Sequence, residues 1–287
     1  MEKIRYIISL LLAKTAVKAI KLRGKSKGTS APGMLAMKIC PNFIREASKM
    51  NNEKTITVTG TNGKTTTTGL LAHFIKESGK KIIHNTEGAN MLTGIATALV
   101  HNVEFNKKSD YMIFECDEAY LRKLYDFLKA DYLLVTNLFR DQLDRYGELD
   151  ITYKKIKEGT EKNLDMTVFL NADDPTLEGI APNNKLIFFG MQDVQYNYET
   201  KSSNAPAENT TCRKCGQTLK YEKVFYAHIG HYTCDCGYKR PTPKYQGFAK
   251  VFDSYSDLTV KYEDKEETFR LNMPGLYNVY NCLLYTS

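Results

Sequence analysis

The sequence lacks an apolar N-terminal run long enough to cross a bilayer. The apolar stretch Tyr6–Ala13 is interrupted by Lys14, whereas a transmembrane helix needs about 20 apolar residues. A secretory signal peptide, with its basic start and short apolar core, is one alternative. The helical spacing of Lys14, Lys18 and Lys21 favours an amphipathic helix over residues 1–22 that packs on the core, and a helix resting on a membrane surface is the second interpretation.

The chain also lacks a dense run of one charge. Its 287 residues carry a formal net charge of +7, which suits an anionic partner such as a nucleotide, a nucleic acid or a lipid surface. The lysines are spread along the sequence, so charge alone does not select among these partners. With 42% hydrophobic and 25% charged residues, the composition is that of an ordinary globular protein.

A disulfide framework is disfavoured as well. The number of cysteines is seven, which is odd, and four of them lie in two tight pairs. Together with the nucleotide site described next, this usage indicates a reducing, cytoplasmic environment.

A strand, a glycine turn and a helix are predicted in succession in the first third of the chain. The run Thr55–Thr59 is β-branched and free of breakers, which is typical of a central strand. Gly60 and Gly63 follow, and glycine lets backbone N–H groups curl around an anion. From Thr65 onward the apolar spacing predicts a helix that Gly79 caps. These elements together predict a phosphate-binding cradle.

Lys64 and Thr65 give this cradle its chemistry. Lys64 is placed to reach the β- and γ-phosphates of a nucleoside triphosphate, and the Thr65 hydroxyl can bind the accompanying Mg2+. Val58 stands where the general P-loop has its first glycine, so the loop is a shortened form. A chance Gly-Lys-Thr in a surface turn is the alternative. The predicted ATP-binding residues of the loop are Gly60, Thr61, Asn62, Gly63, Lys64, Thr65 and Thr66.

Further strands and helices alternate beyond this helix. Strands are predicted at Lys81–His84, Tyr111–Cys116, Asp131–Thr136, Thr167–Leu170 and Leu186–Phe189. Helices are predicted at Gly94–His101, Ala119–Leu128 and Tyr153–Asn163. The alternation predicts an α/β fold with a doubly wound, mostly parallel sheet. In such sheets ligands bind at the C-terminal ends of the strands.

The shortened loop TGTNGKTTT resembles that of the Mur ligase family, ATP-dependent enzymes that activate a carboxylate as an acyl phosphate and then form an amide bond. Other segments resemble the family in the same order: Asn85–Ile95, Val135–Asp144, Leu170–Pro175 and Met273–Asn281. The resemblance runs from about Thr55 to Asn281. It implies the Mur ligase central domain, with ATP and Mg2+ as cofactors and Lys64 and Glu115 as catalytic residues.

The resemblance also implies roles for individual side chains. Glu115 would complete the Mg2+ shell with Thr65, and the alternative is a cluster that caps a helix, the role left to Asp117 and Glu118. Asn278 and Asn281 would contact the adenine, since an amide presents both a donor and an acceptor.

Two segments leave their roles open. Gln142 stands where many members of the family have a histidine that serves a second Mg2+. Lys155 and Lys157 lie near the place where those members have a carbamylated lysine. Because glutamine is a weaker ligand for a hard cation than a carboxylate, only one Mg2+ is expected. The turn Asn171–Pro175 fits a place beside the nucleotide and ordinary turn chemistry equally well.

Four cysteines predict a zinc ribbon. Cys-x2-Cys and Cys-x-Cys pairs at this separation converge on tetrahedral Zn2+. His228 and His231 are possible substitute ligands because the second pair is one residue short. The ribbon carries lysines and aromatic residues but no dense arginine cluster, so no nucleic acid partner is expected. The predicted ligands of a structural Zn2+ are Cys212, Cys215, Cys234 and Cys236.

The expected domains are an N-terminal helical segment with a connector (1–50), the central ATP-binding domain (51–200), the inserted ribbon (201–245) and a return to the central domain (246–287). About fifty residues precede the ATP-binding strand, too few for the uridine-diphosphate domain of most Mur ligases. The chain is expected to be a fragment that is inactive alone, truncated before a C-terminal domain, and residues Cys282–Ser287 are of uncertain native origin.

With the ribbon, these features resemble the branch of the family that amidates the D-glutamate α-carboxyl of the lipid II stem peptide. The resemblance implies ammonia from a GatD-like glutaminase subunit, lipid II at the membrane surface, and a cytoplasmic protein, peripheral at the inner membrane face in one interpretation. One alternative is a folylpolyglutamate-synthase-like ligase. The other is a nucleotide-gated zinc-ribbon binding protein without ligase activity.

Overall fold

A computed structural model describes residues 2–22, 30–49, 51–85, 89–104, 107–139, 148–196 and 210–287. The chain forms two compact units. The first comprises Met1–Thr59, Thr68–Leu134 and Lys154–Thr167, and the second comprises Gly60–Thr67, Val135–Tyr153 and Val168–Ser287. The predicted fold class is confirmed as mixed α/β with a mostly parallel sheet.

Four strands characterise the first unit. They are β1 (Asn51–Thr59), β2 (Ile82–His84), β3 (Ser109–Glu115) and β4 (Tyr132–Val135), in the spatial order β4-β1-β3-β2. β3 runs parallel to β1 and to β2. Val58, Ile113 and Phe114 have no exposed surface, which explains the unbroken apolar and β-branched runs. The strands predicted here are confirmed.

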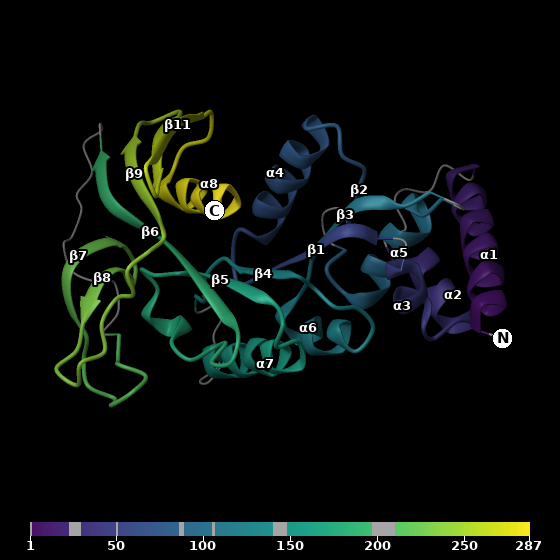
Figure 1. Cartoon of the computed structure of the whole chain (residues 1–287), viewed down its shortest axis with the longest axis horizontal. Helices are drawn as coiled ribbons and strands as arrows, with labels where there is room; N and C mark the ends of the chain where they lie inside the picture. The colour runs from purple at the N-terminus through teal and green to yellow at the C-terminus, as the bar shows by residue number, and fades with distance from the viewer. Residues whose placement is uncertain are drawn as a thin grey trace. The chain divides into compact units, whose positions relative to one another are not determined.

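Helices supply the rest of the first unit. They are α1 (Glu2–Leu22), α2 (Ala31–Ile39), α3 (Phe43–Ser48), α5 (Leu92–Asn102), α6 (Glu118–Tyr125), and most of α4 (Lys64–Glu77) and α7 (Glu148–Lys162). α1 packs beside α2, α3 and α5 (Figure 1). The helices predicted after the glycine loop are confirmed, and Gly79 ends α4 with a positive φ of 80°, as expected for a cap.

The N-terminal helix packs on the core with one of its faces. Tyr6, Leu10 and Ala13 are buried, and the Tyr6 ring lies 5.4 Å from the ring of Phe43. The favoured interpretation, core packing, is therefore confirmed. Within the described residues, no helix combines the length and the apolar character that a membrane span requires.

The breakers Gly28, Ser30 and Pro32 place the connector expected in the N-terminal segment at Lys25–Gly33. This expectation is wrong at its C-terminal end, where α2 includes Pro32 and Gly33. Proline is tolerated in the first turn of a helix because its missing N–H has no partner there. Gly33 lies where α2 crosses α5, and a Cβ there would be 2.0 Å from the Thr93 carbonyl oxygen. Its N–H donates to Thr97 Oγ1 at 2.9 Å. Close helix packing, rather than a flexible linker, accounts for this glycine.

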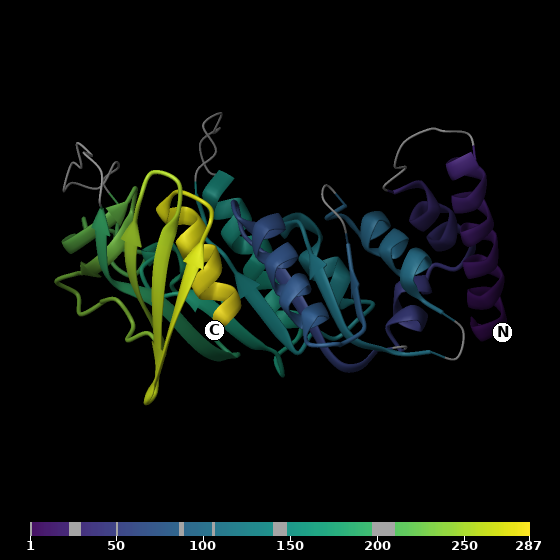
Figure 2. The same ribbon diagram turned by 90° about the horizontal axis from the view of Figure 1, so that it is seen from above.

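The second unit contains a sheet with a helix on it. The strands are β5 (Thr167–Asn171), β6 (Lys185–Tyr196), β9 (Tyr245–Val251), β10 (Ser256–Tyr262) and β11 (Lys265–Leu271), in the order β11-β10-β9-β6-β5. β6 and β9 are parallel, and β9, β10 and β11 are successively antiparallel. Helix α8 (Leu276–Thr286) packs on β6, β9 and β10 (Figure 2).

Two further pieces of the second unit matter for the site. A short 3-10 helix, η1 (Pro175–Leu177), follows β5. Strands β7 (Lys220–Tyr226) and β8 (Ile229–Thr233) form a separate two-stranded antiparallel hairpin. This hairpin belongs to the predicted ribbon.

Candidate functional site

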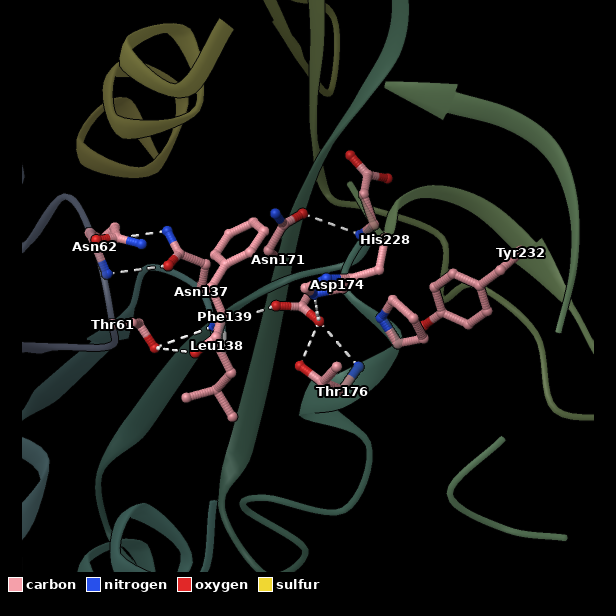
Figure 3. A network of polar contacts seen from close by, with 12 residues as sticks. Thr61, Asn62, Asn137, Leu138, Phe139, Asn171, Asp174, Thr176, His228 and Tyr232 are labelled. Atoms are coloured by element: carbon pink, nitrogen blue, oxygen red, sulfur yellow. Dashed lines mark hydrogen bonds and ion pairs between the residues drawn. The ribbon is translucent and has the colours of Figure 1, made fainter. Parts of the chain in front are cut away.

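The glycine loop after β1 is held by the residues that follow β4. The N–H of Thr61 donates to the Asn137 carbonyl at 2.9 Å, and the N–H of Asn62 donates to Asn137 Oδ1 at 3.1 Å. Asn137 Nδ2 donates back to the Asn62 carbonyl at 3.1 Å, and Thr136 Oγ1 donates to the same oxygen at 2.6 Å. Figure 3 shows Asn137 facing Asn62 across these bonds. Asn137 therefore holds the loop with both its backbone and its side chain.

Thr61 forms a second attachment. Its Oγ1 accepts from the Phe139 N–H at 3.1 Å and lies 3.4 Å from the Phe139 carbonyl. The backbone N–H groups of Thr61 and Asn62 are thus used to shape the loop in this structure. Sequence reasoning placed both residues in the loop, but it missed Thr136 and Asn137, although their segment had been singled out.

The two loop glycines are required by close neighbours. Gly60 has a φ of +124°, and a Cβ there would lie 2.3 Å from Thr136 Oγ1 and 2.8 Å from the Asn137 carbonyl oxygen. Gly63 has a φ of +84°, and a Cβ there would lie 2.3 Å from Asn281 Oδ1. Both positions combine a left-handed backbone with too little space for a side chain.

Lys64 begins the helix that follows the loop. The Thr67 N–H donates to the Gly63 carbonyl at 2.9 Å, so Lys64–Thr66 form the first turn of α4, at the positive end of the helix dipole. Lys64 Nζ donates to the carbonyl oxygens of Gly60 and Thr61. The ammonium group therefore lies over the loop, where it would offset the charge of a phosphate.

Helix α8 brings one of the two predicted adenine contacts to the loop. The Asn281 side chain lies next to Gly63 and is 5% exposed. Asn278, one turn earlier, donates from Nδ2 to the Pro274 carbonyl at 2.8 Å, so its amide stabilises the start of the helix.

Glu115 lies at the C-terminal end of β3 in the first unit. It pairs with Val58, two residues before the glycine loop in the chain. Asn85 fixes its backbone, because Asn85 Oδ1 accepts from the Glu115 N–H and Asn85 Nδ2 donates to the Glu115 carbonyl, both at 2.8 Å. The Asp117 side chain accepts from the Ala119 N–H, so the predicted cap is confirmed for Asp117. Sequence reasoning had not assigned this role to Asn85.

Two adjacent buried carboxylates follow β5, and their pKa values shift in opposite directions. Burial raises the pKa of Asp173, against the lowering effect of the Arg240 charge and the Tyr280 hydroxyl. Burial also opposes ionisation of Asp174, but the His228 charge and the bonds from His228 and Thr176 lower its pKa overall. Asp174 therefore stays ionised at neutral pH.

The same turn offers an unused donor. Asn171 Oδ1 accepts from the Asp173 N–H at 3.0 Å. Its buried Nδ2 finds no hydrogen-bond partner within the described part of the chain. A buried donor of this kind normally has a partner, and Asp174 caps η1 as turn chemistry expects.

The four predicted cysteine ligands converge. Their sulfur atoms all lie within 4.8 Å of one another, with Cys212 and Cys236 at 3.7 Å and Cys215 and Cys234 at 3.5 Å. Tetrahedral zinc with bonds of about 2.3 Å would place neighbouring sulfurs about 3.8 Å apart. The donor set therefore fits Zn2+ closely.

Glycine turns close both cysteine pairs. The Gly216 N–H donates to the Cys212 carbonyl at 2.8 Å, and the Gly237 N–H donates to the Cys234 carbonyl at 3.0 Å. The Tyr238 backbone N–H contributes most to lowering the pKa of Cys236, which falls to about 7. The short second pair is thus accommodated by a tighter turn without loss of a sulfur ligand.

The histidines considered as substitute ligands point elsewhere. His228 Nε2 lies 3.2 Å from Asp174 Oδ1, and His231 Nε2 lies 2.8 Å from the Met191 carbonyl. The mixed cysteine and histidine site is therefore not supported. Ribbon lysines pair with carboxylates, Lys220 with Asp235 at 2.6 Å among them. Gln142, which bears on the second metal, lies outside the described residues.

Comparison with known proteins agrees with this geometry. The sequence profile of the Mur ligase middle domain matches residues 58–286. The MurT subunit of lipid II isoglutaminyl synthase (glutamine-hydrolyzing) from Staphylococcus aureus (strain COL) is 35% identical over 273 residues, which cover 95% of this chain and 60% of MurT. The Streptococcus pneumoniae (strain ATCC BAA-255 / R6) counterpart is 34% identical over 258 residues, which cover 90% of this chain and 56% of that subunit.

A solved structure is also similar to this chain in sequence and fold. A pseudomurein peptide ligase type C from Methanothermus fervidus is 26% identical with a TM-score of 0.64, covering 82% of this chain and 45% of that chain. The present chain thus spans 56% to 60% of the two curated relatives described.

Proposed function

Because the chain belongs to the Mur ligase family, we propose that it is the ATP-dependent part of a ligase that amidates the D-glutamate α-carboxyl of the lipid II stem peptide. The observation that carries the proposal is the glycine loop with Lys64 over it at the start of α4. The identity with two MurT subunits supports the choice of substrate.

In the proposed reaction, a carboxylate oxygen of the substrate attacks the γ-phosphorus of ATP, and the bond from that phosphorus to the ADP oxygen breaks. Ammonia then attacks the acyl carbon of the resulting acyl phosphate, loses a proton, and inorganic phosphate leaves. Lys64 and the first-turn amides of α4 offset the charge of the γ-phosphate as it is transferred. Thr65 and Glu115 are the proposed ligands of Mg2+, which would supply further charge neutralisation when bound.

The nucleotide base is proposed to lie against α8 and the turn after β5. Asn278 and Asn281 are the proposed adenine contacts, and the buried Asn171 Nδ2 is a suitable donor for a purine nitrogen. The ammonia source is proposed to be a GatD-like glutaminase subunit, because both MurT relatives are subunits of a glutamine-hydrolyzing synthase. The cysteine cluster is proposed to hold a structural zinc.

Nucleotide binding is the first test. Titration calorimetry with a non-hydrolysable ATP analogue and Mg2+ should detect binding by the wild-type chain, and Lys64→Ala should weaken it by about 100-fold because a charge-assisted contact is lost. Lys76→Ala is the matched control, since Lys76 is exposed in the last turn of the same helix. Wild-type affinity for the ATP analogue in Lys64→Ala, or no binding by the wild-type chain, would refute the proposal.

Acceptor dependence is the second test. Phosphate release should require lipid II and ammonia, or lipid II, glutamine and a glutaminase subunit. Release that depends instead on a folate with glutamate would identify the folylpolyglutamate-synthase-like alternative. Retention of RNA or DNA that weakens with salt, without any acceptor-dependent release, would identify a binding protein.

A peripheral membrane location is part of the proposal, and two features of the first unit support it. The face of α1 opposite the core exposes Ile4, Ile8, Leu11 and Leu12, each at 48% or more. A cavity of about 470 Å3 gathers five lysines from segments far apart in sequence, and Lys14 of α1 bonds to the carbonyl of Val103 in its lining. An exposed apolar helix face and a cluster of lysines each suit a membrane of anionic lipid. The five lysines are Lys76, Lys80, Lys81, Lys107 and Lys108.

Vesicle sedimentation tests this location. The wild-type chain should bind vesicles rich in phosphatidylglycerol and not vesicles of phosphatidylcholine, and Ile8→Asp with Leu11→Asp should reduce binding by about tenfold. Ile151→Asp is the matched control, because Ile151 is 53% exposed on α7. Equal binding to both vesicle types, or an equal loss in the control, would contradict a specific membrane face.

A further inference from the structure

The tip of the β7–β8 hairpin carries a histidine that the zinc site does not use. Tyr226 and Ile229 pair across the hairpin, which leaves Ala227 and His228 as a two-residue turn. Ala227 has a φ of 47°, a left-handed conformation typical of such tight turns. The turn presents His228 to the second unit's interior, where its side chain is only 12% exposed.

His228 contacts two residues that belong to the surroundings of the glycine loop. Its Nε2 lies 3.2 Å from Asp174 Oδ1, and its ring centroid lies 4.7 Å from that of Phe139. The neighbouring Tyr226 ring stacks on Phe139 at 5.7 Å. Figure 3 shows His228 and Asp174 side by side, with Leu138 and Phe139 close to Asp174.

Asp174 continues this chain of contacts to the loop. Its Oδ2 accepts from the Leu138 N–H at 3.2 Å. Leu138 lies between Asn137, which holds Asn62, and Phe139, which holds Thr61. One carboxylate thus joins the hairpin tip to the segment that fixes the loop backbone.

The burial of Asp174 makes its partners important. The side chain has no exposed surface, and an ionised carboxylate in such a place depends on the groups that bond to it. Thr176 supplies two bonds to Oδ1, Leu138 supplies one to Oδ2, and His228 is the remaining described partner. Without His228, the buried charge of the Asp174 carboxylate would lose one of its partners. We expect the carboxylate to shift as a result, which would loosen the hydrogen bond from the Leu138 N–H to Asp174 Oδ2.

The zinc cluster supports the hairpin from its other end. Cys212, Cys234, Tyr232 and Tyr238 belong to one buried cluster. The Tyr238 hydroxyl donates to the carbonyl of Pro175, the residue after Asp174, at 3.1 Å. The cysteine ligands and the turn that carries Asp174 are therefore joined by direct packing.

We infer that His228 is a positioning residue for the nucleotide site, and that the zinc ribbon sets nucleotide affinity through the contacts from His228 to Asp174 to Leu138. The inference rests on the proposed nucleotide binding. It gives the ribbon a role beyond closing its own hairpin, because a loop held in its bound conformation binds more tightly than one that must be ordered on binding.

Two variants of His228 separate its hydrogen bond from its packing. His228→Leu keeps apolar contact with Phe139 but has no donor, whereas His228→Gln keeps a donor of similar reach. His228→Leu should weaken binding of the ATP analogue by about tenfold, and His228→Gln should restore most of the affinity. His73→Ala is the control, because His73 is exposed on α4. Zinc content, measured by elemental analysis, should be equal in all of these proteins.

A spectroscopic measurement and a metal-free measurement complete the test. The amide resonance of Leu138 should shift in His228→Leu and return in His228→Gln. Removing zinc from the wild type with a chelator should weaken nucleotide binding by a similar factor. This measurement does not depend on the folding of any variant. Unchanged affinity in His228→Leu and in the zinc-free wild type would overturn the inference. Failure of the zinc-loaded wild type to bind nucleotide would instead refute the proposed function.

Discussion

The glycine loop and the cysteine turns use the same residue type for different reasons. Gly60, Gly63, Gly216 and Gly237 all have positive φ values, from 74° to 124°. In this region of backbone space a side chain costs about 1–2 kcal/mol per residue. Backbone conformation alone therefore predicts that a side chain would destabilise the protein by a similar amount at all four positions.

The space around them is what differs. A Cβ at Gly60 or Gly63 would approach another residue to 2.3 Å, whereas a Cβ at Gly216 or Gly237 would meet nothing within 4 Å. The loop glycines are therefore fixed by residues far along the chain, and the cysteine-turn glycines are fixed by their own local turn. In this chain the glycine loop therefore depends on distant packing, whereas each cysteine turn depends mainly on its own residues.

The largest expected effect is that of Gly60→Ala. The new Cβ would press on the Asn137 backbone, which cannot move aside as a side chain can. With the φ penalty added, the free energy of unfolding should fall by about 3 kcal/mol and nucleotide affinity by at least about 100-fold. Urea denaturation and calorimetry measure the two quantities.

Gly69→Ala is the matched control for this substitution. Gly69 lies inside α4, and nothing lies within 4 Å of its Cβ position. Alanine is the better helix former by about 1 kcal/mol, so this variant should be slightly more stable than the wild type. Equal destabilisation by the two substitutions would contradict the steric argument.

The second effect in size is that of Gly63→Ala, for which the three nearest atoms all belong to one side chain. The clash is with the amide of Asn281, so the loss of stability should be about 2 kcal/mol. Asn281→Ala removes the obstacle, and the double variant should therefore be more stable than the sum of the two single changes predicts. Additive losses in a double-mutant cycle would show that the strain at Gly63 is purely conformational.

Much of this fold could be predicted because its signals are local. The β-branched run before Gly60, the glycine and lysine spacing of the loop, and the two cysteine pairs each lie within a few residues of one another. Most strands and helices of the alternating region were located to within a few residues for the same reason. The exceptions are β6, which continues to Tyr196 beyond the predicted end at Phe189, and α7, which begins at Glu148 before the predicted start at Tyr153. Such patterns reflect backbone preferences that operate over one turn or one strand.

The contacts that support the loop could not be predicted in this way. Asn137 lies 75 residues from Asn62, and His228 lies 54 residues from Asp174. No periodicity links residues so far apart, and His228 looked like a metal ligand because a cysteine pair was near it in sequence. The lysines around the 470 Å3 cavity likewise look dispersed until the fold brings their segments together.

A smaller effect is expected for the cysteine turns. Gly216→Ala and Gly237→Ala should each lower the stability of the zinc-loaded protein by about 1 kcal/mol, because only the φ penalty applies. Zinc content and nucleotide affinity should remain those of the wild type. Thermal denaturation measures the stability, elemental analysis the zinc content, and calorimetry the nucleotide affinity. A loss comparable to that of Gly60→Ala would show that the ribbon turns are as constrained as the loop.

The smallest expected effect is that of mild acid on the support of the loop. The pKa of Asp174 is lowered from an ordinary value of 3.8, so its contribution to stability is fully present above that value and is lost only as pH falls through the lower pKa of the folded state. Because the charge of His228 also favours the ionised carboxylate, the difference in unfolding free energy between the wild type and Asp174→Asn should not decline between about pH 7 and pH 5, and it should shrink below about pH 4. Asp173, whose pKa is raised by burial, is present in both proteins, so the difference reports chiefly on Asp174.

A difference that declined already between pH 7 and pH 5 would mean that Asp174 is protonated near neutrality. The loop would then be supported by neutral contacts alone.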